Sequence, residues 1–160
     1  MTKACRALSI FAQYFSGSAL VLMTAIIIAQ VFGRYVLNSS PVWAEQATLL
    51  ILIWCVFFAA AAGVRESFHI RISIVVDHLP DTSRRFANLV ANTVVALFGL
   101  AMVIYGLALA QSTWHHVIPT LGIARGFAYI PIAISGFLIT LFSIERQFVE
   151  SPKEDEQLWN

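Results

Sequence analysis

Long apolar runs with almost no charge constrain the fold of this chain more than any other feature. They cover about residues 8–33, 43–64, 86–111 and 127–144. A helix needs roughly 17–25 predominantly apolar residues to cross the hydrocarbon core of a bilayer. Only 12% of the 160 residues are charged, whereas a typical soluble domain has about 25%. The sequence therefore predicts an all-α integral membrane protein, a single domain of four transmembrane helices over residues 1–160.

The first run has to be distinguished from a secretory signal peptide, because Lys3 and Arg6 precede it. A signal peptide has an apolar region of about 7–15 residues followed by a small-residue cleavage site. The run over 8–33 is longer, and no such site leads into a polar segment. We therefore expect a retained first helix.

Two polar segments complete the predicted architecture. Residues 69–79 are apolar in part but too few to cross a bilayer as a helix. We expect them to form a short interfacial helix between the second and third spans. Residues 145–160 form a polar, acidic tail.

The distribution of Lys and Arg predicts the orientation, because cytoplasmic loops are enriched in both residues. With the N-terminus inside, only Arg34 and Arg125 lie outside. The remaining basic residues then lie on the cytoplasmic side: Lys3, Arg6, Arg65, Arg71, Arg84, Arg85, Arg146 and Lys153. We expect both termini to be cytoplasmic.

The spans contain no Asp, Glu, Lys, Arg or His near their middle. A charge there costs about 2.5–3.5 kcal/mol on the insertion scale, and it usually marks a functional site. The sequence thus offers no proton relay, no facing histidines for a haem and no nucleophile with a base. His115 and His116 are adjacent and point in different directions, and Cys5 and Cys55 are expected to be free thiols. We expect no catalytic, cofactor or metal site, and no basic patch for nucleic acid.

Several short motifs occur in a recognisable order along this four-span frame. They are Arg34-Tyr35, Trp43-Ala44-Glu45 at the start of the second span, His69-Ile70-Arg71 with Asp77, and Tyr129 with Pro131. In order and spacing they resemble the small membrane subunit of TRAP transporters, the DctQ type. The resemblance covers about residues 34–131. It departs from the family at Gln46, where a second acid often follows the first.

The resemblance implies a role in a tripartite secondary transporter of the bacterial inner membrane. In such a system a periplasmic binding protein captures an organic anion, typically a carboxylate. A separate large membrane subunit carries the substrate and sodium sites. The small subunit binds the large one and enlarges its fixed scaffold, so the chain is expected not to be an enzyme.

Nine residues are candidate contacts to the partner subunit or to lipid headgroups. They are Arg34, Trp43, Glu45, Arg65, His69, Arg71, Asp77, Asn88 and Asn92. Glu45 fits two roles, a helix-start acid favoured by the helix dipole or a subunit contact. Arg65, His69 and Arg71 fit headgroup binding as well as a partner contact. Asp77 fits a helix cap or a local pair with Arg71 or Arg84.

Two alternative functions remain open at this point. One is a membrane anchor subunit of a redox complex, which would show the absorption of a bound haem. The other is a small transporter acting alone as a homo-oligomer, which would need a polar stripe along a pore.

Cysteine labelling tests the orientation. In a chain whose two native cysteines are replaced, we expect Ser39→Cys to react with a membrane-impermeant maleimide from outside intact cells. Ser83→Cys should react only after the membrane is opened. The reverse pattern would overturn the predicted topology.

Overall fold

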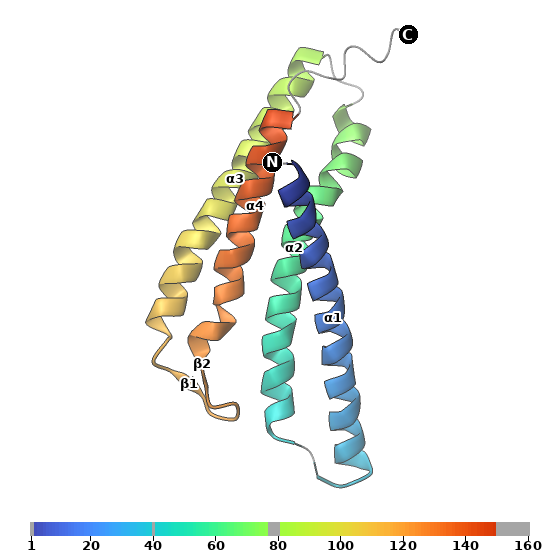
Figure 1. The fold of residues 1–160 in the computed structure, drawn as a ribbon, viewed down its shortest axis with the longest axis vertical. Helices are drawn as coiled ribbons and strands as arrows, with labels where there is room; N and C mark the ends of the chain where they lie inside the picture. Colours follow the sequence, from blue (N-terminus) through green and yellow to red (C-terminus); the bar gives the residue numbers. More distant parts are fainter. Residues whose placement is uncertain (1, 40, 77–80, 150–160) are drawn as a thin grey trace.

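Four long helices build the structure, which is a computed structural model (Figure 1). It describes residues 2–39, 41–76 and 81–149, and the side chains of 5–39, 41–65 and 89–145. The elements are α1 (Thr2–Tyr35), α2 (Trp43–Val76), α3 (Asp81–Ser112), β1 (Val117–Ile118), β2 (Ile123–Ala124), the 3₁₀ helix η1 (Arg125–Ala128) and α4 (Ile130–Val149). Four segments are long and apolar enough to cross a membrane: Cys5–Tyr35, Trp43–Arg65, Leu89–Ser112 and Arg125–Glu145. The predicted all-α membrane fold with four spans is confirmed.

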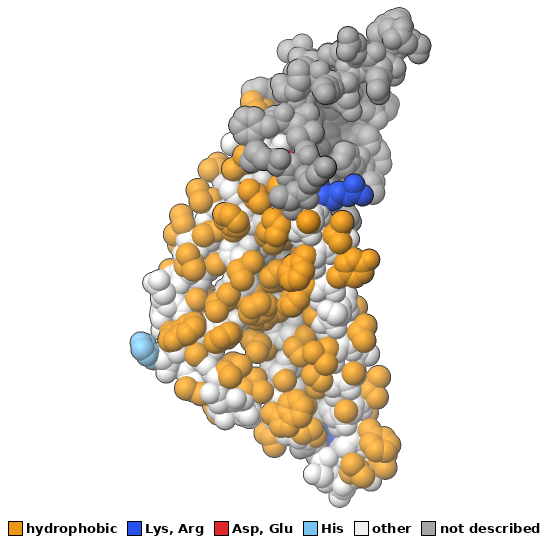
Figure 2. Space-filling model, in the orientation of Figure 1, with side chains coloured by type: hydrophobic (Ala, Val, Ile, Leu, Met, Phe, Trp, Pro, Cys, Tyr) orange, Lys and Arg blue, Asp and Glu red, His pale blue; other side chains and the backbone are white. Residues whose placement is uncertain are grey.

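The helices pack as two antiparallel pairs and not as a closed ring. α1 lies against α2, α3 lies against α4, and the pairs meet where α2 contacts α4 (Figure 1). The order across the molecule is therefore α1, α2, α4, α3. α4 is the central helix, since half of its spanning window is buried against 11% for α1. Hydrophobic side chains cover most of the described part of the face drawn in Figure 2, as a lipid-facing surface requires.

A seam of small residues joins α1 to α2. Cys5, Ser9, Ala12, Ser16 and Ala19 are all buried, and they follow one another at alternating steps of four and three residues. This spacing keeps one face of a helix toward an antiparallel neighbour. Small side chains on that face let the two backbones approach closely.

Two hydrogen bonds cross this seam within the spanning region. The Ser16 hydroxyl donates to the Cys55 carbonyl oxygen at 3.2 Å, and the Cys55 thiol donates to the Ser16 carbonyl oxygen at 3.3 Å. Hydrogen bonds between membrane helices contribute about 0.6 kcal/mol each on average. Both cysteines are free, as predicted.

Glycines make the α3–α4 contact close. A Cβ atom added to Gly99 would lie 2.8 Å from the Gly136 carbonyl oxygen and 2.5 Å from the Thr140 hydroxyl. A Cβ atom added to Gly106 would lie 2.9 Å from the Ala133 nitrogen. Gly99 and Gly106 therefore lie in the packed interface between α3 and α4.

The connections at the end opposite the N-terminus are compact. After α1, the Ser39 amide donates to the Gly33 carbonyl oxygen at 3.0 Å, and Asn38 adopts a positive φ of 51°. Asn tolerates this left-handed conformation better than most residues with a side chain. Between α3 and α4, β1 pairs antiparallel with β2. We call this end, with residues 36–42 and 113–124, the loop end; the other end is the terminal end.

Two features differ from the predicted architecture. The short interfacial helix expected over 69–79 is not shown as a separate element, because α2 continues as one helix to Val76. Residues 65–76 contain no Gly or Pro to interrupt it, and residues 77–80 lie outside the described residues. The fourth span also begins with η1 instead of α-helix, and α4 starts only at Ile130.

Gly99→Leu should lower the thermal stability of the purified protein by about 1–3 kcal/mol, because the larger side chain must displace the α4 backbone. Gly17→Leu is the matched control, since nothing lies within 4 Å of a Cβ atom added there. The check is the unfolding midpoint in mild detergent. Equal midpoints for the two variants would contradict the close α3–α4 contact.

Candidate functional site

Three of the predicted contact residues gather at the loop end. Arg34 is exposed in the last turn of α1, and Glu45 is exposed in the first turn of α2. Trp43, the first residue of α2, is 49% exposed. The structure forms no ion pair between Arg34 and Glu45. Both charges thus remain available on the surface of the described chain.

The remaining candidates belong to the opposite, terminal half of the molecule. Arg65 is half-buried on α2, and Asn92 is 3% exposed on α3. His69 and Arg71 lie on the helical backbone of α2, and Asn88 lies on that of α3. The side chains of these three residues, and Asp77 as a whole, lie outside the described part of the structure. The burial of Asn92 places it in the bundle interior and away from lipid.

A buried polar cluster at the terminal end joins three helices. The Cys5 thiol of α1 lies within hydrogen-bonding reach of the Glu145 carboxylate of α4, and Arg65 of α2 lies close enough to act on the same thiol. The Arg65 guanidinium carbon is 5.9 Å from the centre of the Phe142 ring. Glu145 is only 9% exposed. These contacts tie α1, α2 and α4 together at one level.

The Glu145 carboxylate is the least satisfied group in this cluster. Its Oε1 atom is buried and has no hydrogen-bond partner. A buried carboxylate depends on a nearby cation. Arg65 acts on the same Cys5 thiol as Glu145, but no ion pair joins the two side chains in the described part of the chain. The sequence places Glu145 at the start of a polar tail, and its position directly after an apolar run is the one sign that it could be buried.

A cluster of aromatic rings holds α2 against α1 and α4. The Phe15 and Phe58 ring centres are 4.8 Å apart, and Trp54 stacks on Phe58 at 6.0 Å. The Trp54 indole nitrogen donates to the Phe127 carbonyl oxygen of η1 at 3.2 Å. Trp54 therefore links the two helix pairs.

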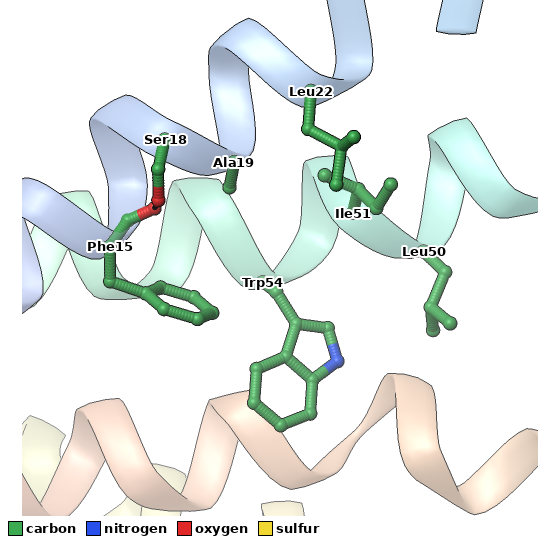
Figure 3. Close-up of a pocket in the computed structure, with 7 residues that line it drawn as sticks. All are labelled: Phe15, Ser18, Ala19, Leu22, Leu50, Ile51 and Trp54. Carbon is green, nitrogen blue, oxygen red and sulfur yellow. Dashed lines mark hydrogen bonds between the residues drawn. The ribbon is translucent and has the colours of Figure 1, made fainter.

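Beside these rings lies an apolar groove of about 510 Å³. Residues of α1 and α2 line it: Phe15, Ser18, Ala19, Leu22, Leu50, Ile51 and Trp54 (Figure 3). The Ser18 hydroxyl donates to the Phe15 carbonyl oxygen at 2.9 Å. The lining therefore offers an occupant apolar contact and no free hydroxyl.

The histidines at the loop end are surface residues. His115 and His116 are both exposed, next to Trp114, which stacks on Phe127 at 5.7 Å. Within the part of the chain that the structure describes, no three His, Cys, Asp or Glu side chains gather in a way that could hold a metal ion.

A double-mutant cycle tests the cluster at the terminal end. Arg65→Met should destabilise the protein, because it removes the positive charge of this cluster, and adding Glu145→Gln should recover part of the loss by removing the buried negative charge. We expect a coupling energy of about 0.5–3 kcal/mol from thermal unfolding. Arg125→Met, an exposed arginine at the loop end, is the control and should combine additively with Glu145→Gln. Additivity in both cycles would contradict the Arg65–Glu145 interaction.

Comparison with known proteins identifies this architecture. The model of the family described as "Tripartite ATP-independent periplasmic transporters, DctQ component" matches residues 23–152. A TRAP transporter small permease protein of Haemophilus influenzae is 27% identical over 143 residues, which are 87% of this chain and 86% of that protein. The C4-dicarboxylate TRAP transporter small permease protein DctQ of Vibrio cholerae is 30% identical over 82 residues, 51% of this chain and 35% of that protein.

A third relative is much longer than this chain. The sialic acid TRAP transporter permease protein SiaT of Haemophilus influenzae is 19% identical over 137 residues, which are 86% of this chain but 22% of that protein. These relatives are transporter proteins and not enzymes. The family match covers more than half of the chain and agrees with four apolar helices, so the predicted resemblance is confirmed. The chain is a multi-pass bacterial inner-membrane protein that belongs to the DctQ family of TRAP transporter small permease subunits.

Proposed function

We propose that this chain is the scaffold subunit of a sodium-coupled TRAP transporter that takes up an organic carboxylate anion. A large membrane subunit moves the anion, and a periplasmic binding protein delivers it. The match to the DctQ component over residues 23–152 is the observation that carries the proposal.

The distribution of polar groups supports a scaffold role. The charged residues of the described spans lie near their ends, as Arg34, Glu45 and Arg65 illustrate. Threonine hydroxyls inside the spans donate to the carbonyl oxygen one turn earlier, as at Thr24 and Thr48. Hydroxyls that already donate their proton within the helix are poor hydrogen-bond donors to an anion. The transport path is therefore assigned to another subunit.

The relatives' names support both the partner and the substrate class. SiaT is named a permease protein, and the stretch similar to this chain makes up 22% of it. This fraction is consistent with a small unit acting beside a larger one. The compounds named for SiaT and for the Vibrio cholerae protein, sialic acid and a C4-dicarboxylate, both carry a carboxylate group.

The orientation and the contact residues belong to the same proposal. With both termini in the cytoplasm, the loop end with Arg34, Trp43 and Glu45 faces the periplasm. These residues then contact the large subunit or lipid headgroups, as do Arg65, His69, Arg71, Asp77 and Asn88 at the cytoplasmic side, whereas the buried Asn92 packs inside the bundle.

Purification of the tagged chain from its host in mild detergent tests the proposal. We expect a large, many-span membrane protein to accompany it in near-equal amount, as identified by mass spectrometry. The pair should take up a carboxylate only with sodium and the binding protein present. Recovery of the chain alone or as a homo-oligomer would contradict the scaffold role, and a haem absorption band would favour a redox anchor.

Glu45→Gln extends the same assay to one contact residue. The substitution keeps the size of the side chain and removes its charge. If Glu45 contacts the large subunit, recovery of that subunit should fall by about ten-fold, which corresponds to about 1.4 kcal/mol. Gln46→Glu, which restores the acid common in the family, is the control. Unchanged recovery with Glu45→Gln would assign Glu45 to helix-start stabilisation alone.

A further inference from the structure

The two helix pairs are staggered at the loop end. α4 and η1 begin beside Trp54, because the Trp54 indole contacts the Phe127 backbone. α2 extends from Trp54 back to Trp43, about 16 Å at 1.5 Å per residue. α1 extends even farther, to Tyr35. Figure 1 accordingly shows the α1–α2 loop reaching farther along the long axis than the β hairpin. At the loop end, α1 and α2 thus extend beyond the start of α4.

The apolar groove lies at this step. Figure 3 shows Phe15 and Trp54 extending from α1 and α2 toward α4, with Leu22 and Leu50 farther along the same pair. The groove is therefore a direct continuation of the α2–α4 interface, on the surface that α4 leaves uncovered. Leu22 is 54% exposed there.

The side-chain polar groups in the lining are already bonded. The Ser18 hydroxyl donates to the Phe15 carbonyl oxygen, and the Trp54 indole donates to the Phe127 carbonyl oxygen. An occupant needs no hydrogen-bonding group to match them, so the groove selects an apolar surface.

The aromatic wall of the groove is preorganised, and small side chains of α1 continue the surface beyond the groove. Phe15 and Trp54 line the groove, and their rings stack on Phe11 and Phe58, respectively. These contacts hold one wall in place in the isolated chain, which lowers the ordering cost of binding. Beyond Leu22, the same face of α1 continues at helical spacing with Ala25 and Ala29, both exposed. Small residues there allow another helix to approach the α1 backbone closely.

We propose that this groove, with the adjoining face of Ala25 and Ala29, seats an apolar transmembrane helix of the large TRAP permease subunit. The inference rests on the proposed function, which supplies that partner. The helix extends the row α1, α2, α4, α3 by occupying the place beside α1 and α2 that α4 leaves open. A bulky aliphatic or aromatic side chain of the partner fills the space between Leu22, Leu50 and Trp54.

A helix fits this surface better than the alternatives. The small residues at positions 25 and 29 favour close approach of a helix backbone. They offer a flexible lipid acyl chain only a shallow surface with little contact area. The α3 face provides the contrast, since Leu97 and Ile104 are 61% and 58% exposed and cover it with large side chains suited to lipid.

Site-specific photocrosslinking in native membranes tests the assignment. A photoreactive phenylalanine analogue replaces Leu22 or Leu50 in the groove, and Leu97 or Ile104 on α3 as matched controls. We expect the groove positions to crosslink to the many-span protein that co-purifies with the wild-type chain, and the α3 positions to crosslink only to lipid. Adducts from the groove to lipid alone, or to a second copy of this chain, would overturn the proposal.

A filling substitution provides an independent readout. Ala29→Trp should reduce recovery of the large subunit by about ten-fold, while the unfolding midpoint of the purified chain stays unchanged, because Ala29 is exposed. Ala108→Trp, at an exposed position of α3, should leave recovery unchanged. Equal recovery with both variants would overturn the proposal.

The failure of this inference is distinguishable from failure of the proposed function. If the wild-type chain brings no large membrane protein with it, the scaffold function itself fails. If the wild-type chain brings that protein and only the α3 positions crosslink to it, the function stands and the groove is the wrong surface.

Discussion

Close contact between helix backbones is the constraint on which the rest of this structure depends. Within a bilayer, apolar side chains gain no free energy by leaving lipid for one another, so helices associate through van der Waals packing and interhelical hydrogen bonds. Here Ala12, Ser16 and Ala19 bring α1 to α2. Gly99 and Gly136 bring α3 to α4, to the point where a single added methyl group would collide with the opposing backbone.

Pairwise packing of this kind explains the open arrangement of the four helices. Each seam joins two helices that are adjacent in sequence, and the two pairs meet where α2 contacts α4. The joint between the pairs depends on aromatic and charged contacts instead, with Trp54 on the η1 backbone at one end and Arg65 beside Phe142 at the other. A row of helices exposes far more surface than a closed bundle, and a subunit that binds a larger partner requires such surface.

The sequence predicted the features that follow from composition and residue spacing. It missed those that depend on which segments pack against each other. Apolar length predicts four spans, and the motifs from Arg34 to Pro131 indicate the family. The burial of Glu145 was not predictable, because a lone acid after an apolar run resembles the start of a solvated tail. Nor was the two-residue pairing of β1 with β2, which is too short to produce an alternating pattern. A separate interfacial helix over 69–79 was expected from the length of the apolar run alone, whereas α2 continues to Val76.

The hydrogen bonds of the threonine hydroxyl groups connect this packing to function. Thr24, Thr48 and Thr93 donate to the carbonyl oxygen four residues earlier in their own helices. Each bond engages the hydroxyl proton within the helix. Donation of that proton to a solute would have to compete with a bond already made. A transport path needs the opposite arrangement, with polar groups left open toward a water-filled cavity. The spanning helices of this chain therefore suit a fixed support whose contacts with its surroundings are mostly apolar, as at the groove beside Trp54.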